Sequence, residues 1–221
     1  MAKENTRKVK TYEELEFTDD FMFCKVLENN PDLCKQLTEL ILGRKIGNIV
    51  RLQEQNAIRI TADGKGVRFD VYLEDDENSV YELEMQNVLL EELPLRNRYY
   101  QGMIDLKILE KGAKYKELKR SCIIFIMLKN PYPEVGLHRY SFANLCREMP
   151  SLEMGDMAEK IWLCAEGTED DISDAMKRFL DFLTTGKGSD EFTRKLEDKV
   201  KKGKDHKEWR LEYMTLLEKY E

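Results

Sequence analysis

Two stretches of alternating apolar and polar residues, on either side of an acidic turn, constrain the fold of this chain more than any other feature. They are residues 66–73 (GVRFDVYL) and 80–88 (VYELEMQNV), and residues 74–79 (EDDENS) between them have the composition of a turn. Side chains alternate between the two faces of a strand, so each stretch has one apolar face and one polar face. The pattern predicts an antiparallel β-hairpin.

The register of the hairpin determines which polar side chains meet. With a turn at residues 75–79, Tyr72 lies opposite Glu82, Asp70 opposite Glu84, and Arg68 opposite Gln86. Opposed carboxylates destabilise a hairpin, and a divalent cation between them removes that cost, which makes Asp70 and Glu84 candidate ligands for Mg²⁺ or Mn²⁺. The alternative is that this polar face is the solvated outer face of an edge hairpin, because acidic residues are mostly exposed.

The remaining patterns predict elements in an order typical of an α/β fold. Residues 121–128 (SCIIFIML) form a continuous apolar run, as expected of a central strand buried on both faces. Helices are predicted at 18–42, broken near Pro31, and at 93–111, 172–185 and 191–220, with an interruption near Gly203; further strands are predicted at 49–55, 140–142 and 161–165. These elements predict a mixed β-sheet flanked by helices, with a helical C-terminal tail.

The chain divides by composition into three parts. Residues 1–15 are expected to form a flexible leader, 16–168 the α/β core and 169–221 a helical extension. In the extension, Trp209, Tyr213 and Leu216 form an apolar seam that is expected to pack on the core or on a partner chain, so a homo-oligomer stays open.

Cysteine and histidine usage narrows the chemistry. The five cysteines are odd in number and form no C-x-x-C, so the thiols are expected to be reduced and mostly buried. Only two histidines are present, which excludes histidine-rich metal sites. The basic N-terminus lacks the apolar stretch of a secretory signal, and no apolar run approaches the ~18 residues of a membrane span. We therefore expect a cytoplasmic protein whose chemistry comes from carboxylates, amides, lysines or hydroxyls.

Six stretches of the sequence, in order, carry a resemblance to a known family. They are FTDDFMFCKVL at 17–27, GVRFDVYLEDDENSVYELEMQ at 66–86, LRNRYYQGMID at 95–105, GAKYKELKRSCIIFIM at 112–127, HRYSFANLCREMPSLEMGD at 138–156 and EWRLEYM at 208–214. Together they resemble the PD-(D/E)XK nuclease superfamily and, more closely, the PD-(D/E)XK nuclease family transposases, also called the recombination-promoting nuclease family. The resemblance implies a restriction-endonuclease-like fold.

The resemblance also implies catalytic roles. Asp70 and Glu84 match the metal-binding acidic pair of the superfamily. Asp20 matches an acidic residue on the first helix, which Asp19 is expected to cap. Gln86 stands where the superfamily usually has lysine, and this branch typically has glutamine there. Glutamine can position a water by hydrogen bonds but carries no charge, so activation of the water falls to the metal.

Three further residues near this site have alternative interpretations. Arg96 and Tyr100, which follow the hairpin, match a pocket suited to phosphate contact and base stacking, and an ordinary place on the helix surface is an equal alternative. Glu82 shares the polar face of the hairpin and is expected to be a solvated strand residue rather than a ligand.

These expectations point to a Mg²⁺-dependent DNA endonuclease related to transposition or recombination, with DNA as its partner and no membrane association. The net charge of -7 counts against a passive DNA coater, and less against a nuclease whose acidic centre is masked by metal ions. Two alternatives stay open. One is a non-catalytic binding or regulatory protein that keeps the nuclease fold, and the other is a nuclease-like toxin or defence component.

Overall fold

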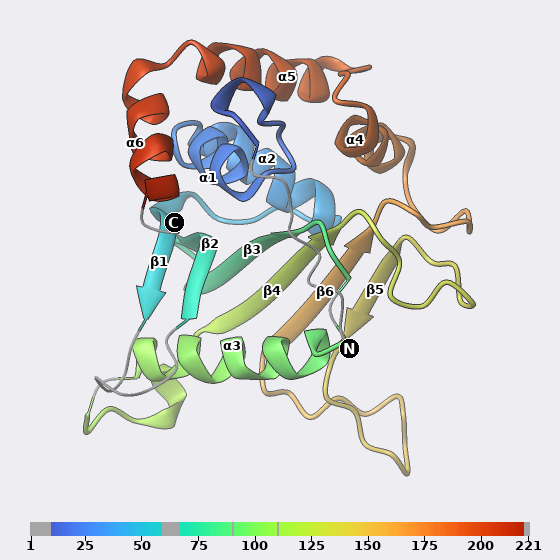
Figure 1. Cartoon of the computed structure of the whole chain (residues 1–221). Helices are drawn as coiled ribbons and strands as arrows, with labels where there is room; N and C mark the ends of the chain where they lie inside the picture. The colour runs from blue at the N-terminus through green and yellow to red at the C-terminus, as the bar shows by residue number, and fades with distance from the viewer. Residues whose placement is uncertain (1–9, 59–66, 90, 110, 219–221) are drawn as a thin grey trace, which may run out of the picture.

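The computed structural model describes residues 10–58, 67–89, 91–109 and 111–218, and the structural statements below concern these residues (Figure 1). The helices are α1 (Asp20–Glu28), α2 (Pro31–Leu42), α3 (Leu93–Ile108), α4 (Asp174–Thr185), α5 (Glu191–Lys204) and α6 (Lys207–Glu218), with short 3-10 helices η1 (Tyr12–Glu14) and η2 (Tyr115–Glu117). The strands are β1 (Ile49–Ile58), β2 (Val67–Asp75), β3 (Ser79–Gln86), β4 (Arg120–Met127), β5 (Arg139–Phe142) and β6 (Ala158–Cys164).

The six strands form one mixed sheet in the order β1-β2-β3-β4-β6-β5. Strands β1, β2 and β3 are antiparallel neighbours, β3, β4 and β6 run parallel, and β5 closes the sheet antiparallel to β6. The predicted α/β fold and the predicted hairpin are therefore confirmed. Strands β2 and β3 lie inside the sheet, because β1 and β4 flank them, so the alternative of a solvated edge hairpin is wrong.

Helices cover both faces of the sheet. Figure 1 shows α3 crossing one face, while α1, α2 and α4–α6 form a layer on the other, called the multi-helix layer below. Strand β4 contributes to both cores: Cys122, Ile124 and Ile126 pack toward the multi-helix layer, and Ile123, Phe125 and Met127 toward α3. This arrangement explains why the strand is apolar from Cys122 to Met127, within the run at 121–128.

The alternation predicted for the first hairpin strand breaks at Asp70. Val71 and Leu73 pack toward the multi-helix layer, whereas Phe69 packs on the α3 side, where its ring stacks with that of Tyr72 at 6.2 Å. Strict alternation would have placed Phe69 with Val71. The break coincides with the last β2–β3 pair, Val71 with Leu83.

Local chemistry explains the helix boundaries at the N-terminal end of the fold. The predicted break near Pro31 is confirmed, and the side-chain amides of Asn29 and Asn30 donate to the carbonyl oxygens of Lys25 and Val26, which closes the end of α1. Asp19 precedes α1 as expected, but its side chain makes no hydrogen bond to the first turn of the helix. Its carboxylate instead accepts a hydrogen bond from the backbone N–H of Glu16 and forms an ion pair with Lys10.

The C-terminal helices pack on the start of the chain. Three residues of α6 are partly buried against the apolar core on the side of the multi-helix layer: Trp209, Tyr213 and Leu216. The break between α5 and α6 falls just after Gly203, at residues 205–206. Within the expected leader, residues 1–9 lie outside the described residues, whereas 10–15 are part of the packed structure, since Tyr12 and Leu15 are both 2% exposed. The division at residues 168 and 169 remains a prediction.

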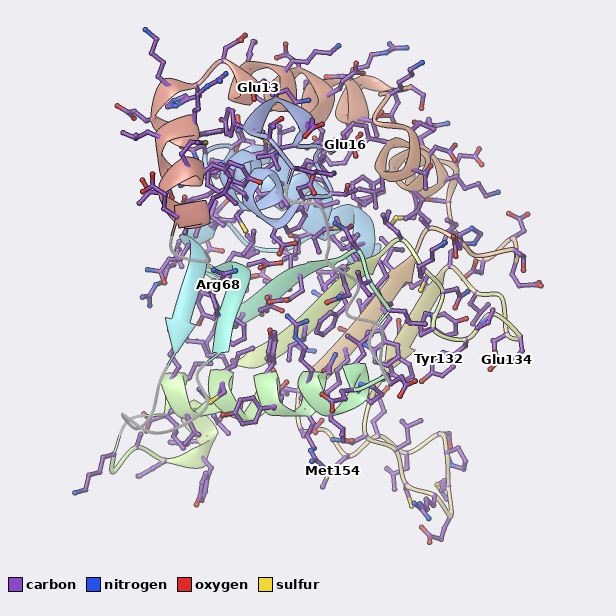
Figure 2. All side chains as sticks on the ribbon, viewed as in Figure 1. Glu13, Glu16, Arg68, Tyr132, Glu134 and Met154 are labelled. Carbon is purple, nitrogen blue, oxygen red and sulfur yellow. The ribbon has the colours of Figure 1, made fainter. Side chains whose placement is uncertain are left out.

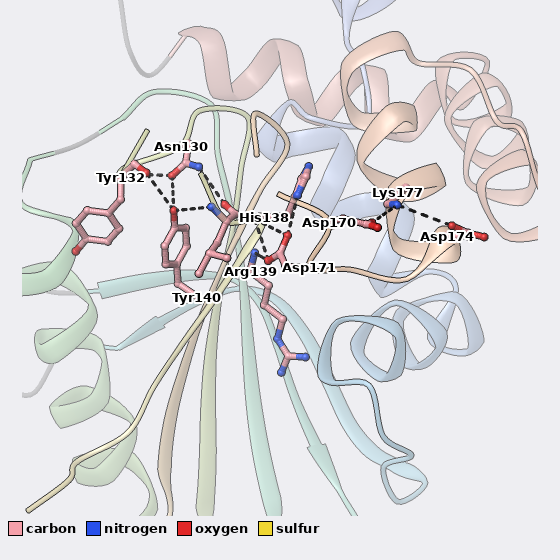
Figure 3. A network of polar contacts seen from close by, with 10 residues as sticks. Asn130, Tyr132, His138, Arg139, Tyr140, Asp170, Asp171, Asp174 and Lys177 are labelled. Atoms are coloured by element: carbon pink, nitrogen blue, oxygen red, sulfur yellow. Dashed lines mark hydrogen bonds and ion pairs between the residues drawn. The ribbon is translucent and has the colours of Figure 1, made fainter. Parts of the chain in front are cut away.

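A polar network anchors the outer strand β5 (Figure 3). The Asp171 carboxylate accepts the backbone N–H groups of His138 and Arg139, and one of its oxygens lies 2.9 Å from His138 Nδ1. The Tyr140 hydroxyl donates to Asn130 Oδ1 at 3.1 Å. These contacts tie the segments after β4 and β6 to the edge of the sheet.

Among the described helices, none combines the length and apolar character needed to cross a membrane.

The contact between Tyr12 and α5 gives a prediction about stability. The buried hydroxyl of Tyr12 donates to the carbonyl oxygen of Gly203 at 2.6 Å. Tyr12→Phe leaves that carbonyl without its donor, so we expect the free energy of unfolding to fall by about 1–3 kcal/mol in urea denaturation. Tyr115→Phe is the matched control, because Tyr115 is 84% exposed. Equal stability of the two variants would show that this contact does not hold the start of the chain.

Candidate active site

Two carboxylates take the place of ladder hydrogen bonds where β2 and β3 stop pairing. The backbone N–H of Asp70 donates to Glu84 Oε1 at 3.3 Å, and the backbone N–H of Met85 donates to Asp70 Oδ2 at 3.2 Å. Asp70 is 6% exposed and Glu84 1% exposed. Each carboxylate is therefore oriented by the backbone of the opposite strand, which explains how a two-stranded ladder can hold two acids close together.

A cavity of about 220 Å³ opens at this point. Its lining residues come from α1, β2, the end of β3 and α3: Asp20, Arg68, Asp70, Glu84, Met85, Gln86, Asn87 and Arg96. The structure thus brings the four predicted catalytic residues Asp20, Asp70, Glu84 and Gln86 to one cavity. Figure 2 labels Arg68, which is exposed on β2 beside it.

Asn87 was not singled out by the sequence analysis. Its side-chain amide donates to the carbonyl oxygen of Thr18, just before α1. The bond links the end of β3 to the start of the helix that begins with Asp20, so it helps to position that carboxylate at the cavity. An asparagine after a strand carries no sequence signal for such a contact.

Arg96 of α3 is the central cation of the site. Its Nη2 lies 2.5 Å from Glu84 Oε2 and its Nη1 donates to Gln86 Oε1 at 2.8 Å. Its Nε and Nη2 also donate to the Tyr100 hydroxyl, at 2.9 and 2.6 Å. One guanidinium therefore joins β3 to α3, in the forked geometry that suits arginine.

Tyr100 faces the interior instead of the surface. It is 6% exposed, and its ring lies 5.1 Å from that of Phe69 and 6.0 Å from that of Phe125. A ring buried in this way cannot offer its face to a base, so its burial does not support the stacking role that the resemblance implied. What it contributes is a hydroxyl that accepts from Arg96.

Glu82 is fully buried, so the expectation of a solvated strand residue is wrong. The reason is tertiary: β3 is an inner strand, and α3 covers the face on which Glu82 lies. No N–H group of the described residues donates to either oxygen of Glu82. Burial and the neighbouring Glu84 raise the pKa of Glu82 well above its usual range. The two carboxyls can share a hydrogen bond only while one of them is protonated.

The other acids of the site are perturbed in the same direction. Burial, with the charges of Glu84 and Asp20 adding to it, raises the pKa of Asp70 well above its usual range. Burial raises the pKa of Glu84 to about 7, with Arg96 opposing the shift. Buried acids with raised pKa values in a cavity are typical of functional sites.

The donor set fits a hard divalent cation. Within the described residues, no three cysteine, histidine or carboxylate side chains form a cluster that could hold a metal ion. Asp70 and Glu84 nevertheless supply the one or two carboxylates that Mg²⁺ commonly uses, together with waters and substrate phosphate oxygens. A cation beside them would favour their ionised forms against the burial that raises their pKa values.

An acidic pair at the end of an inner β-hairpin, on a mixed sheet with a crossover helix, defines a PD-(D/E)XK nuclease-like protein. The chain matches the family described as PD-(D/E)XK nuclease family transposase over residues 17–145, and it belongs to that family. No curated protein and no solved structure matches the chain.

The buried Glu82 predicts a dependence of stability on pH in the presence of a chelator. An acid whose pKa is higher in the folded chain stabilises the fold fully below its ordinary value of 4.5, and this contribution is lost as pH rises toward the folded value. Glu82→Gln has no such loss. We expect its stability advantage over wild type to grow from about pH 5 to about pH 8, measured by urea unfolding.

The control for this experiment is Glu134→Gln, which changes an exposed carboxyl that Figure 2 places away from the sheet. Its stability relative to wild type should stay constant across the same pH range. A constant difference for Glu82→Gln as well would contradict the raised pKa of Glu82.

Proposed function

We propose that this protein hydrolyses phosphodiester bonds of DNA with the help of Mg²⁺ or Mn²⁺. The observation that carries the proposal is the pair of backbone-oriented, buried carboxylates Asp70 and Glu84 at one small cavity with Asp20, Gln86 and Arg96. Their crowding fits a metal ion, and the family to which the chain belongs is one of nuclease-related transposases.

In this proposal, Asp70 and Glu84 are the metal ligands. A bound divalent ion supplies Lewis acidity toward the scissile phosphate and lowers the pKa of a coordinated water. Asp20 is the first residue of α1 and lies at the same cavity. Its negative charge near the two ligands contributes to the raised pKa of Asp70.

Gln86 orients water in the proposed site. Its Oε1 accepts from Arg96 and its Nε2 donates to the carbonyl oxygen of Val88 at 2.6 Å. An amide oxygen has two lone pairs and an amide nitrogen two hydrogens, so one acceptor and one donor position of Gln86 stay available for water.

Arg96 supplies the positive charge that the neutral Gln86 lacks. The superfamily usually places lysine at the position of Gln86, and here the guanidinium bonded to Gln86 lies at the same cavity. The Arg96 side chain is 30% exposed, so it can also reach a phosphate of the substrate. This assignment makes Arg96, rather than residue 86, the cation that stabilises charge at the phosphate.

The ion pair between Arg96 and Glu84 also favours a second function. A guanidinium already compensates Glu84, so the site has an internal cation and can fold without a metal. This observation suits a non-catalytic binding protein that keeps the nuclease fold. We propose the enzyme first, because burial, with the charges of Glu84 and Asp20 adding to it, raises the pKa of Asp70, and a bound divalent cation would favour its ionised form.

The proposed setting is cytoplasmic, in transposition or recombination, with DNA as the partner. None of the five cysteines forms a disulfide, and four of them are buried, which suits a reducing compartment.

Metal binding and cleavage are predicted to depend on the acidic pair. Mn²⁺ should bind wild type in isothermal titration and should not bind Asp70→Asn. Nicking of supercoiled plasmid should require Mg²⁺ or Mn²⁺ and stop on chelation. Asp70→Ala and Glu84→Ala lose a ligand and with it several kcal/mol of electrostatic stabilisation, so their activity should be abolished. Gln86→Ala loses one hydrogen bond of ~1–2 kcal/mol and should be slowed roughly five- to thirty-fold.

Asp181→Asn, on the exposed face of α4, is the matched control and should retain full activity. Nicking by Asp70→Ala at the wild-type rate would mean that the activity comes from another site or from a contaminant. If no metal supports nicking and Mn²⁺ does not bind, the non-catalytic function is the correct one.

A further inference from the structure

A second cavity, of about 600 Å³, lies between α3 and the β6–β5 side of the sheet. It shares no lining residue with the cavity around Asp70 and Glu84, called the nuclease-type cavity below. Its lining comes from α3, the segment before β4, and the strands and loops at that side, and it includes Asn97, Arg98, Phe142, Lys160 and Trp162. Its volume is within the range of pockets that bind small molecules.

Three buried polar atoms at this cavity have no hydrogen-bond partner within the described part of the chain. They are both side-chain amide atoms of Asn97 and the indole Nε1 of Trp162, and each of these residues is 4% exposed. Buried donors and acceptors are nearly always paired in native proteins, so each unpaired one requires an explanation. A ligand that offers a donor and acceptors at the cavity provides it.

One wall of the cavity is aromatic. The ring of Trp162 lies 4.9 Å from that of Phe142 in an edge-to-face arrangement and 5.9 Å from that of Tyr132 in a stacked one. Phe142 is 37% exposed, so its ring is available for contact with a planar ligand. Among natural ligands, aromatic walls of this kind suit heterocycles that stack.

Charged groups at the rim complement a phosphate. Arg98 and Lys160 line the cavity, while the two carboxylates that also line it are engaged: Asp105 accepts from Gln101 at 2.9 Å and Asp156 accepts from Asn144 at 2.5 Å. Lys160 Nζ donates to the carbonyl oxygen of Ala158 at 3.3 Å and Lys119 pairs with Glu74 at 2.6 Å, so Arg98 is the cation through which the rim would meet an added anion.

We propose that this second cavity binds a nucleobase, with Asn97 pairing with its edge and Phe142 stacking on its face. A side-chain amide presents one donor and one acceptor side by side, and asparagine uses them to bind adenine in two hydrogen bonds. An apolar ligand would leave the amide unpaired, and a sugar phosphate alone would not use the aromatic wall. Adenine is accordingly the base to test.

The base belongs either to an unpaired stretch of a DNA strand or to a free nucleotide. The first source rests on the proposed function, and helix geometry connects the two sites. Asn97 follows Arg96 directly, and Asn97, Gln101 and Asp105 recur every four residues along one stripe of α3. Arg96 and Tyr100 occupy the neighbouring stripe, so the two cavities lie on adjoining faces of the same helix, within reach of one bound strand.

Tryptophan fluorescence tests the proposal in the presence of a chelator, so that a failure of cleavage does not affect the result. Trp162 and Trp209 are the two tryptophans of the chain, and Trp209→Phe leaves Trp162 as the reporter. Titrants are adenosine monophosphate, single-stranded oligodeoxyadenosine and ribose 5-phosphate. We expect a saturable change with either of the first two and none with ribose 5-phosphate.

Variants assign the change to the cavity. In the same background, Asn97→Leu should raise the Kd for the base about tenfold or more, because it removes both hydrogen bonds at similar volume. It also removes buried unpaired atoms, so its melting temperature should equal or exceed that of the parent. Phe142→Ala, at a partly exposed position, should weaken binding as well.

A response to adenosine monophosphate identifies a free nucleotide as sufficient, and a response to the oligonucleotide alone identifies a DNA strand as the source. Either supports the proposal if Asn97→Leu weakens it. An equal response to ribose 5-phosphate overturns it in favour of a phosphate site. No response to any titrant, or unchanged affinity in folded Asn97→Leu, also overturns it.

Discussion

The structure of the site depends on one ion pair, between Arg96 of α3 and Glu84 of β3. Glu84 is buried beside Asp70 and Glu82, and without a cation these three acids would repel one another in a poorly hydrated space. The guanidinium also binds Gln86 and Tyr100, so it holds the crossover helix over the sheet at this point. Removing one partner of such a pair costs about 3–5 kcal/mol when both are buried, and less here because Arg96 is partly exposed.

The acidic crowding is stabilised only in part, and this is where fold and function oppose each other. Glu82 remains without an N–H donor among the described residues, and the pKa values of three neighbouring acids are raised. A core optimised for stability alone would place apolar residues there. Sites that violate the rules of local stability are commonly functional, because a ligand or a metal ion supplies the missing interaction. The unpaired Asn97 amide on the other stripe of α3 follows the same logic.

Helix α3 is consequently the element on which both proposed sites depend. The multi-helix layer on the opposite face of the sheet supports the nuclease-type cavity indirectly. That layer is closed by contacts between distant parts of the chain: Tyr12 with the carbonyl of Gly203, Tyr213 with the carbonyl of Lys10, and Lys25 with Glu212 at 2.8 Å. These bonds keep α1 in place, and α1 carries Asp20 to the cavity. The C-terminal helices therefore act on the site through the packing of α1, since none of their described residues lines the cavity.

The α/β fold and the hairpin follow from the amino-acid sequence, because alternation and turn composition are local properties of residues 66–88. Of the predicted register, the pair of Tyr72 with Glu82 is confirmed, whereas the ladder ends at Val71 and Leu83, before Asp70 and Glu84. The apolar run at 121–128 likewise identified a strand buried on both faces. The tertiary structure, by contrast, buries Glu82 and Tyr100, since their burial depends on α3 crossing an inner strand. It alone also decided that Phe69 breaks the alternation, that Arg96 pairs with Glu84, and that Asn97 and Trp162 meet across a cavity. Such contacts join residues far apart in the chain, and no local pattern records them.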